Sequence, residues 1–169
     1  PVVSSAASDV YKRQVFGIFG HGNVACLGQA LEENQNELPT YRGHHEQNMA
    51  LTGIGYARGK RRQQIFVATS SVGPGATNMV TAAAVAMSNR LPILLLPGDT
   101  YANRMPDPVL QQVEHFNNPG ITANDAFKPV TRYFDRITRP EQIIQSFPNA
   151  VQTMLDPADC GPALSLIHI

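Results

Sequence analysis

The sequence predicts an α/β fold, in which a parallel β-sheet carries helices on both faces. Short apolar runs alternate with longer segments of helical periodicity from Val15 onward. The runs at residues 65–69 and 93–96 are apolar, as strands covered on both faces are. Strands that alternate with helices at this spacing form parallel sheets with helices on both sides.

The strands are expected at the short apolar runs. The first run is β-branched and aromatic and ends at Gly20, and the third follows a polar lead that ends in Gln63 and Gln64. The final run follows Cys160 and begins a last strand. In chain order, these strands would occupy residues 15–19, 38–42, 65–69, 93–96, 128–134 and 161–166.

The helices are expected where apolar residues recur three and four positions apart. Val24, Leu27 and Leu31 have this spacing in the first helix, and Pro140 suits the first turn of the fourth. The third helix is rich in alanine, which allows close packing. The second would place five small or apolar residues on one face: Met49, Ala50, Gly53, Ile54 and Ala57. The four helices would span residues 23–34, 46–58, 76–88 and 140–155.

The two ends of the chain differ in character from the middle. Residues 1–14 lack the charged start and long apolar core of a signal peptide, and their string SSAASDVYKRQ resembles translated sequencing-adapter sequence. The closing LSLIHI, residues 164–169, resembles the same kind of read-through. We therefore expect non-native tails at 1–14 and 164–169 around one domain at 15–163, cut from a longer protein. Short disordered native tails are the alternative.

Composition excludes several classes of function. Thirteen Lys and Arg balance thirteen Asp and Glu, so neither nucleic acid nor a membrane surface is an expected partner. The two cysteines, Cys26 and Cys160, form no CxxC motif and favour a reducing, cytoplasmic location. The longest apolar stretch, residues 91–97, is far short of the roughly 20 residues that span a bilayer.

Ligands of parallel sheets bind beyond the carboxyl ends of the strands, which here means the loops at 20–23, 43–47, 70–78 and 98–108. The first loop continues from Gly20 to Ala25 as a GxGxxA motif, which suits a phosphate at a helix N-terminus or a tight turn. A dinucleotide site would place an acid about 20 residues further on. Arg42 stands there instead and could accept an NADP phosphate.

The next two loops carry the remaining candidates. His44 and His45 precede Glu46, but adjacent helical residues point about 100° apart, so no metal site is predicted. Glu46 could complement the helix dipole or belong to a site. In the third loop, Gly-Pro-Gly at residues 73–75 indicates either close backbone approach or a rigid turn. This loop lacks the Lys-Ser/Thr of a Walker motif.

The order of these motifs resembles the pyrimidine-binding domain of thiamine-diphosphate enzymes. It runs from a glycine-rich loop through His-Glu-Gln and Gly-Pro-Gly-Ala-Thr-Asn to LPILLLPGD, and it covers about residues 15–163. The string TSSVGPGATNMVTAAAVAMSNRLPILLLPGD looks like the branch that opens a trihydroxycyclohexane-1,2-dione ring in myo-inositol catabolism. An acetolactate synthase-like carboligase is the alternative within the family. A dinucleotide-binding or non-catalytic interaction domain is the alternative outside it.

The resemblance implies roles for individual residues. Glu46 would be catalytic, through a hydrogen bond to a ring nitrogen of the cofactor's aminopyrimidine. The substrate-facing candidates are His21, Gln111 and Gln112. The cofactor-binding set would be Gly20, Gly22, Glu46, Gly73, Pro74, Gly75 and Asn78.

The resemblance also implies partners that this chain lacks. Thiamine diphosphate would be held through Mg²⁺ at a GDG…N motif of a separate C-terminal domain, so this chain would supply no metal ligand. The active site would lie between two subunits of a homodimer or homotetramer acting on a small cyclic dione. Without its middle and C-terminal domains, the chain is expected to be inactive.

Overall fold

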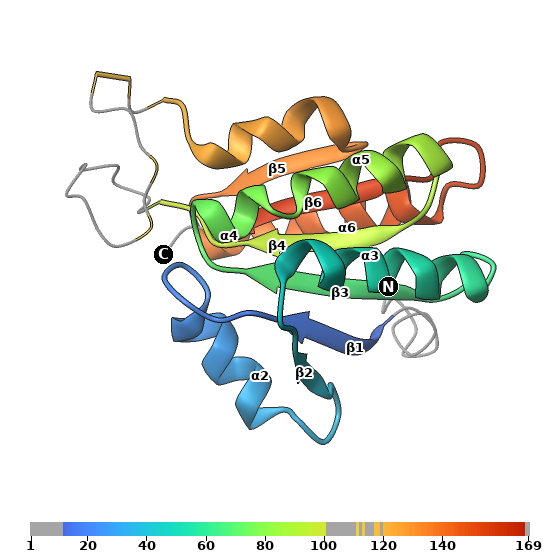
Figure 1. The fold of residues 1–169 in the computed structure, drawn as a ribbon, viewed down its shortest axis with the longest axis horizontal. Coiled ribbons are helices and arrows are strands. Elements are labelled where there is room, and N and C mark those ends of the chain that lie inside the picture. Colours follow the sequence, from blue (N-terminus) through green and yellow to red (C-terminus); the bar gives the residue numbers. More distant parts are fainter. Residues whose placement is uncertain (1–11, 101–110, 112, 114–116, 119, 168–169) are drawn as a thin grey trace.

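The fold is built on a six-stranded parallel sheet in the order β2-β1-β3-β4-β6-β5 (Figure 1). The computed structural model describes residues 12–100, 111, 113, 117, 118 and 120–167. The strands are β1 (Lys12–Gly17), β2 (Thr40–Arg42), β3 (Ile65–Ser70), β4 (Ile93–Pro97), β5 (Tyr133–Ile137) and β6 (Pro162–Ile167).

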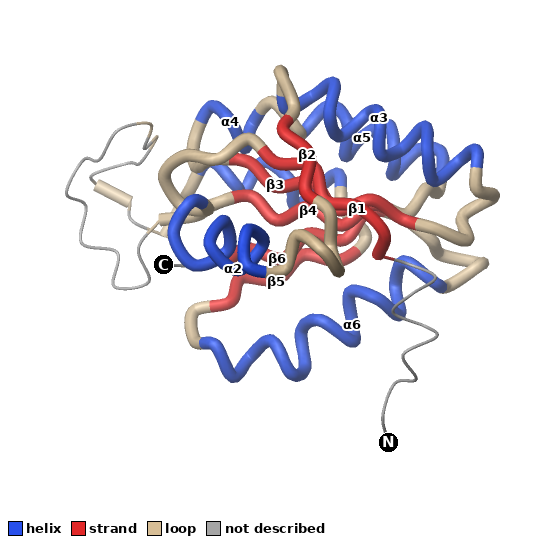
Figure 2. Tube along the Cα trace, turned by 90° about the horizontal axis from the view of Figure 1, so that it is seen from below, coloured by secondary structure: helices blue, strands red, loops and turns tan. Residues whose placement is uncertain are grey.

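Helices cover both faces of the sheet, as the sequence predicts (Figure 2). One face carries α3 (Glu46–Gly59), α4 (Pro74–Thr77) and α5 (Val80–Asn89), and the other carries α2 (Gln29–Glu33) and α6 (Ile143–Leu155). Each layer has its own buried core: Ala50, Met79 and Phe127 belong to the first, and Leu31 and Met154 to the second.

The central strands owe their position to their composition. Every residue of β3 is buried, and Ile93, Leu94 and Leu95 of β4 are at most 1 % exposed. Apolar side chains on both faces of a strand remove the most surface from water when helices cover both sides. All six strands run the same way, so their carboxyl ends share one edge of the sheet, which is called the carboxyl edge below.

Two predicted helices are interrupted in the structure. The first is divided into a short irregular turn, η1 (Val24–Gly28), and α2, because Ala25 and Cys26 have non-helical backbone angles. The alanine-rich helix is divided into α4 and α5 near Asn78. Arg90 then ends α5 in the left-handed conformation, with φ of 52°.

The prediction of a strand at residues 128–134 is wrong about where the strand lies. Ala123–Val130 forms a 3₁₀ helix, η2, and β5 begins only at Tyr133. Thr122 caps this helix with its side-chain oxygen, and Asp125 Oδ2 accepts a hydrogen bond from the Thr122 amide, which together form a capping box. The spacing Thr122-x-x-Asp125 was therefore the available signal for a helix start. A second 3₁₀ turn, η3 (Pro140–Gln142), leads into α6.

The terminal strands extend beyond their expected limits. β1 begins at Lys12, where it pairs with Ile65, and it lies between β2 and β3. β6 continues to Ile167, and Leu164 and Leu166 are fully buried. Residues 12–14 and 164–167 are thus parts of the sheet, although the sequence analysis assigned them to the tails at 1–14 and 164–169. The non-native origin of the two tails stays a prediction.

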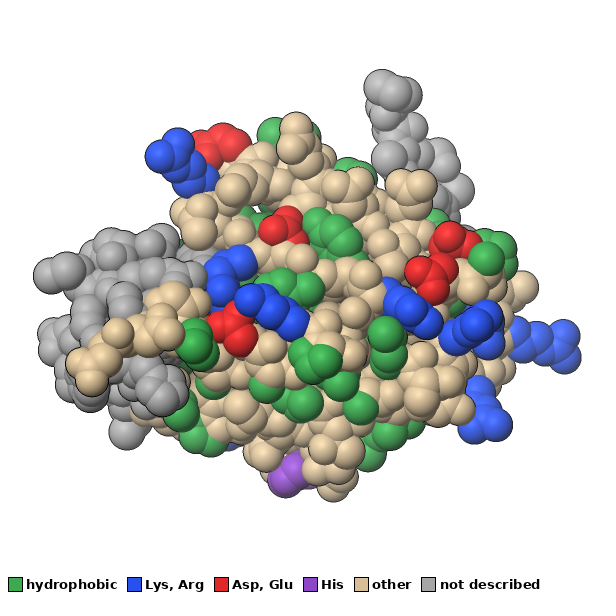
Figure 3. All heavy atoms as spheres, turned by 90° about the horizontal axis from the view of Figure 1, so that it is seen from above, with side chains coloured by type: hydrophobic (Ala, Val, Ile, Leu, Met, Phe, Trp, Pro, Cys, Tyr) green, Lys and Arg blue, Asp and Glu red, His purple; other side chains and the backbone are tan. Residues whose placement is uncertain are grey.

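The surface seen in Figure 3 has no single dominant charge. Lys and Arg side chains lie beside acidic ones in several places, and hydrophobic side chains are scattered between them. Among the described residues, no helix combines the length and apolar character needed to cross a bilayer.

Candidate functional site

The turn after β1 is organised by a buried asparagine. The Asn23 side chain accepts a hydrogen bond from the Gly20 amide at 2.9 Å and donates to the Ile18 carbonyl at 3.2 Å and Thr69 Oγ1 at 3.0 Å. Asn23 is 1 % exposed, so these bonds satisfy a polar group inside the protein. The turn is thereby tied to the end of β3, at the carboxyl edge.

The same turn rests on the loops that follow β3 and β4. The Val72 amide donates to the His21 carbonyl at 2.9 Å, and the Gly98 amide donates to the Ser70 carbonyl at 2.9 Å. Gly22 has φ of 93°, and a Cβ atom built on it would lie 2.9 Å from the Cα of Gly98. The backbones of three loops therefore meet with no space for side chains between them.

Glu46 begins α3 at this edge, as predicted. The helix starts there because His45 is extended and its carbonyl accepts the first helical hydrogen bond, from the Met49 amide at 3.0 Å. The Glu46 side chain is half-buried, and its Oε2 accepts a hydrogen bond from Asn78 Nδ2 at 3.0 Å. The structure thus joins two predicted site residues, 32 positions apart, in one contact.

The Gly-Pro-Gly segment packs against the chain itself. A Cβ atom on Gly75 would lie 2.3 Å from Ser71 Oγ and 3.2 Å from Glu46 Oε1. Gly73 has φ of 71°, and a Cβ atom there would meet the Gln111 carbonyl oxygen at 1.8 Å. Glycine is therefore required at position 73 before any ligand is considered, whereas a Cβ atom at position 75 would require the Ser71 side chain to move. Pro74 opens α4 and is exposed.

The substrate-facing candidates differ in where they lie. The His21 side chain is exposed beside the Gly22 turn. Gln111 is brought to the same edge, because its backbone lies against Gly73 and its Oε1 would lie 3.5 Å from a Cβ atom on Gly20. Gln112 lies outside the described residues.

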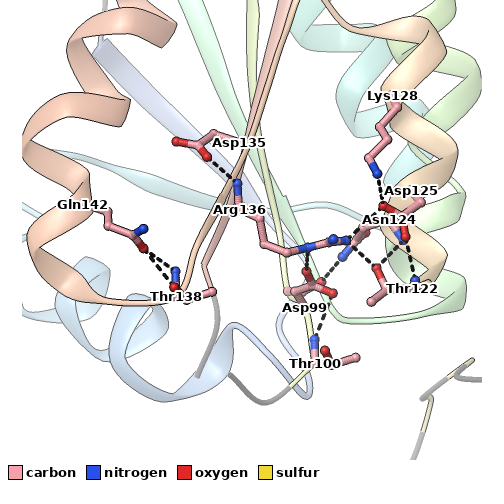
Figure 4. Close-up of polar contacts among 11 residues, drawn as sticks. Asp99, Thr100, Thr122, Asn124, Asp125, Lys128, Asp135, Arg136, Thr138 and Gln142 are labelled. Atoms are coloured by element: carbon pink, nitrogen blue, oxygen red, sulfur yellow. Dashed lines mark hydrogen bonds and ion pairs between the residues drawn. The ribbon is translucent and has the colours of Figure 1, made fainter. Parts of the chain in front are cut away.

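A polar cluster that the sequence analysis missed lies next to these loops (Figure 4). Asp99 follows β4 with a fully buried side chain, and Arg136 Nε of β5 binds its Oδ2 at 2.8 Å. Arg136 also donates to Thr122 Oγ1 at 2.8 Å and contacts Asp125 Oδ1 at 3.3 Å. The string LPGD marked Asp99 as a polar residue directly after a buried strand. Arg136 carried no local signal, since its partner is 37 positions away.

Asp125 has a perturbed acidity within this cluster. Burial by itself raises the pKa of Asp125, but hydrogen bonds from Lys128 and the Thr122 amide, with the charges of Arg136 and Lys128, outweigh it and lower the pKa below 3.8. The carboxylate form is therefore favoured in the folded protein.

Backbone amides of the glycine-rich turn are hydrogen-bonded within the protein and are not available to a dinucleotide. Gly20 N–H is occupied by the Asn23 side chain, and the Asn23 and Val24 amides both donate to the Gly20 carbonyl, at 3.4 and 3.1 Å. The residues after it form an irregular turn in place of a continuous helix. A pyrophosphate cradle needs free amides at a helix N-terminus. The local geometry thus supports the tight-turn interpretation. No group of three or more metal-ligating side chains occurs within the described ranges.

The family described as "Thiamine pyrophosphate enzyme, N-terminal TPP binding domain" matches residues 2–118 of the chain. The chain belongs to this family. The six-stranded parallel sheet is consistent with it. Glu46, Gly73 and Asn78 lie inside the matched range, whereas Arg136 lies beyond it.

Curated relatives narrow the comparison within the thiamine pyrophosphate enzymes. A protein of Clostridium tetani named 3D-(3,5/4)-trihydroxycyclohexane-1,2-dione hydrolase is 57% identical over 147 residues, covering 87% of this chain and 23% of the relative. A Geobacillus thermodenitrificans protein of the same name is 55% identical over 151 residues, covering 89% and 24%. One from Listeria monocytogenes serotype 4b is 52% identical over 149 residues, covering 88% and 23%. The chain thus spans about a quarter of the length of these relatives.

Proposed function

We propose that this chain is the pyrimidine-binding part of a thiamine-diphosphate-dependent hydrolase that opens 3D-(3,5/4)-trihydroxycyclohexane-1,2-dione. The identity of 57% to a relative of that name, over 87% of the chain, is the observation that carries the proposal. It favours the hydrolase over an acetolactate synthase-like carboligase, because the relatives cited above share the one name.

The residues at the carboxyl edge fit the aminopyrimidine end of the cofactor. The Glu46 side chain is half-buried at the carboxyl edge, and Asn78 Nδ2 donates a hydrogen bond to one of its two carboxylate oxygens. The Gly-Pro-Gly segment lies beside it, since a Cβ atom built on Gly75 would be 3.2 Å from Glu46 Oε1. Gly20, Gly22, Gly73, Pro74 and Gly75 would form the wall, and Asn78 would orient Glu46.

Glu46 would hold and release a proton at its carboxyl group. In its protonated form it would donate a hydrogen bond to a ring nitrogen of the aminopyrimidine, and in its ionised form it would accept a proton back. When bound, thiamine diphosphate would supply a nucleophilic carbon and an electron sink for carbon–carbon bond cleavage. His21, Gln111 and Gln112 would face the substrate, whose hydroxyl and carbonyl groups need hydrogen-bonding partners.

The diphosphate and Mg²⁺ would be held outside this chain. The part of the relatives that this chain does not span, about three quarters of their length, has room for middle and C-terminal domains. A homodimer or homotetramer in the cytoplasm, with the site shared between subunits, completes the proposal.

The test is a ring-opening assay with the full-length protein that contains this chain. Hydrolysis between the two carbonyl carbons adds OH to one and H to the other, so each turnover yields an acid and releases a proton. Proton release should require both thiamine diphosphate and magnesium. Condensation of pyruvate with loss of CO₂, and no proton release with the dione, would instead establish the carboligase.

A further inference from the structure

The polar cluster of Figure 4 connects the edge strand β5 to the predicted cofactor site. Arg136 lies on β5, the edge strand, whereas Asp99 lies two residues after the central strand β4. The Asp99 side chain is fully buried and that of Arg136 is 16% exposed. Burying a carboxylate costs free energy that a well-placed cation offsets, so removing Arg136 would take away a charge that stabilises buried Asp99.

Two routes lead from Arg136 to the backbone at Gly98. The first is the ion pair with Asp99, the next residue in the chain. The second runs through Thr122, whose Oγ1 accepts from Arg136 at 2.8 Å and from the Asn124 amide at 3.3 Å. Asn124 Nδ2 then donates to the Gly98 carbonyl at 2.8 Å. Arg136 is therefore connected to Gly98 in two ways: through Asp99, the next residue in the chain, and through Thr122 and Asn124 to the Gly98 carbonyl.

Gly98 supports the turn that the proposed function places at the cofactor. A Cβ atom on Gly98 would lie 2.8 Å from the Gly22 Cα and 3.1 Å from the His21 carbonyl oxygen. Any displacement of Gly98 toward the turn would therefore push directly on the Gly22 backbone. Close-packed backbones transmit such shifts because no flexible side chain separates them.

We propose that Arg136 is a positioning residue for the cofactor site. Through Asp99 and Thr122 it fixes Gly98, and Gly98 fixes the Gly20–Asn23 turn. Arg136 itself does not touch the cofactor, since its guanidinium is engaged by the three side chains of the cluster. The inference rests on the proposed function, because it assigns the cofactor to the edge that this turn lines.

The test compares four variants of the full-length protein. Arg136→Met removes the charge, and Arg136→Lys keeps the charge but cannot reproduce the branched set of contacts. Asp99→Asn with Arg136→Met removes both charges of the pair. Arg132→Met is the matched control, since Arg132 lies just before β5 and pairs with the exposed Asp159 at 3.4 Å, away from the cluster. The two readouts are the dissociation constant for thiamine diphosphate, at fixed magnesium, and the unfolding midpoint without cofactor.

Arg136→Met should weaken cofactor binding on the order of tenfold, comparable with the loss of partners that orient ligating groups at metal sites. The double variant should bind more tightly than Arg136→Met, because it also removes the buried Asp99 charge that Arg136 offsets in the parent protein. Arg132→Met should bind like the parent. A lower unfolding midpoint with an unchanged dissociation constant for Arg136→Met would overturn the proposal and leave the cluster a purely stabilising one.

Arg136→Lys decides the matter where Arg136→Met fails to fold. Its dissociation constant should lie clearly above that of the parent, and a value equal to the parent's would overturn the positioning role. Failure of the parent protein itself to bind thiamine diphosphate would contradict the proposed function, which is a separate outcome.

Discussion

The contact between Gly98 and Gly22 gives a direct test of how rigid the carboxyl edge is. The substitution Gly98→Ala adds a Cβ atom 2.8 Å from the Gly22 Cα. Carbon atoms pack at about 3.5–4.0 Å, so the two backbones must separate by about 0.7 Å or more. Gly98 itself is not among the glycines with positive φ, so the expected effect is steric.

Forcing an extra carbon into a close-packed site costs about 1–3 kcal/mol. At about 2–4 °C for each kcal/mol in a domain of 150–250 residues, the unfolding midpoint should fall by about 2–12 °C. The assay is thermal unfolding of the full-length protein, followed by circular dichroism with and without thiamine diphosphate. We expect the gain in midpoint on adding cofactor to shrink as well, because the Gly20–Asn23 turn moves.

Gly55→Ala is the control for adding the same carbon elsewhere. A Cβ atom on Gly55 would meet nothing within 4 Å, and the residue is exposed in the middle of α3. Alanine is favoured over glycine inside a helix by about 0.5–1 kcal/mol, so this midpoint should rise slightly. If Gly98→Ala and Gly55→Ala shift the midpoint alike, the close packing of the three loops is refuted.

Two further predictions concern titratable groups. The folded state lowers the pKa of Asp125 below 3.8, so its contribution to stability is present above that pH and is lost as the pH falls through the lowered value. Asp125→Asn should thus destabilise the protein at neutral pH, and urea unfolding should show the difference from the parent shrinking in acid. Burial raises the pKa of the Cys160 thiol, partly offset by Arg62 and increased by Asp156, whereas Cys26 is exposed. Brief alkylation followed by peptide mapping should therefore find Cys26 labelled well before Cys160; labelling of Cys160 as fast as that of Cys26 would contradict its burial.

The fold was predictable where local pattern and burial agree. The apolar runs that became β3 and β4 need cover on both faces, and only a parallel sheet between helices provides it. The strand prediction at residues 128–134 was wrong because it relied on the apolar residues Val130 and Phe134. The start of the helix at Thr122 is instead encoded in a side-chain capping pattern. The break of the alanine-rich helix near Asn78 has no strong sequence signal.

The candidate site was predictable only in part, for a physical reason. Loops at the carboxyl edge are brought together by sheet topology, so Glu46, Gly73 and Asn78 could be assigned to one edge from their order along the chain. Contacts between distant elements, such as Asp99 with Arg136, depend on strand order. The order β4-β6-β5 places Arg136 two strands away from β4, and the sequence pattern does not specify that order.

Exchange of the thiazolium proton of bound thiamine diphosphate for deuterium tests the central claim most directly. The full-length protein is compared with Glu46→Gln, which preserves size but cannot hold an ionisable proton, and with His44→Gln, an exposed neighbour that makes no described contact with Glu46. We predict that Glu46→Gln still binds the cofactor but exchanges the proton about 10²–10⁴-fold more slowly, the usual size of a general acid–base contribution, and that His44→Gln exchanges nearly normally. Exchange at the parent rate in cofactor-loaded Glu46→Gln would show that Glu46 is only a charge at the start of α3, and would contradict the assignment of the site.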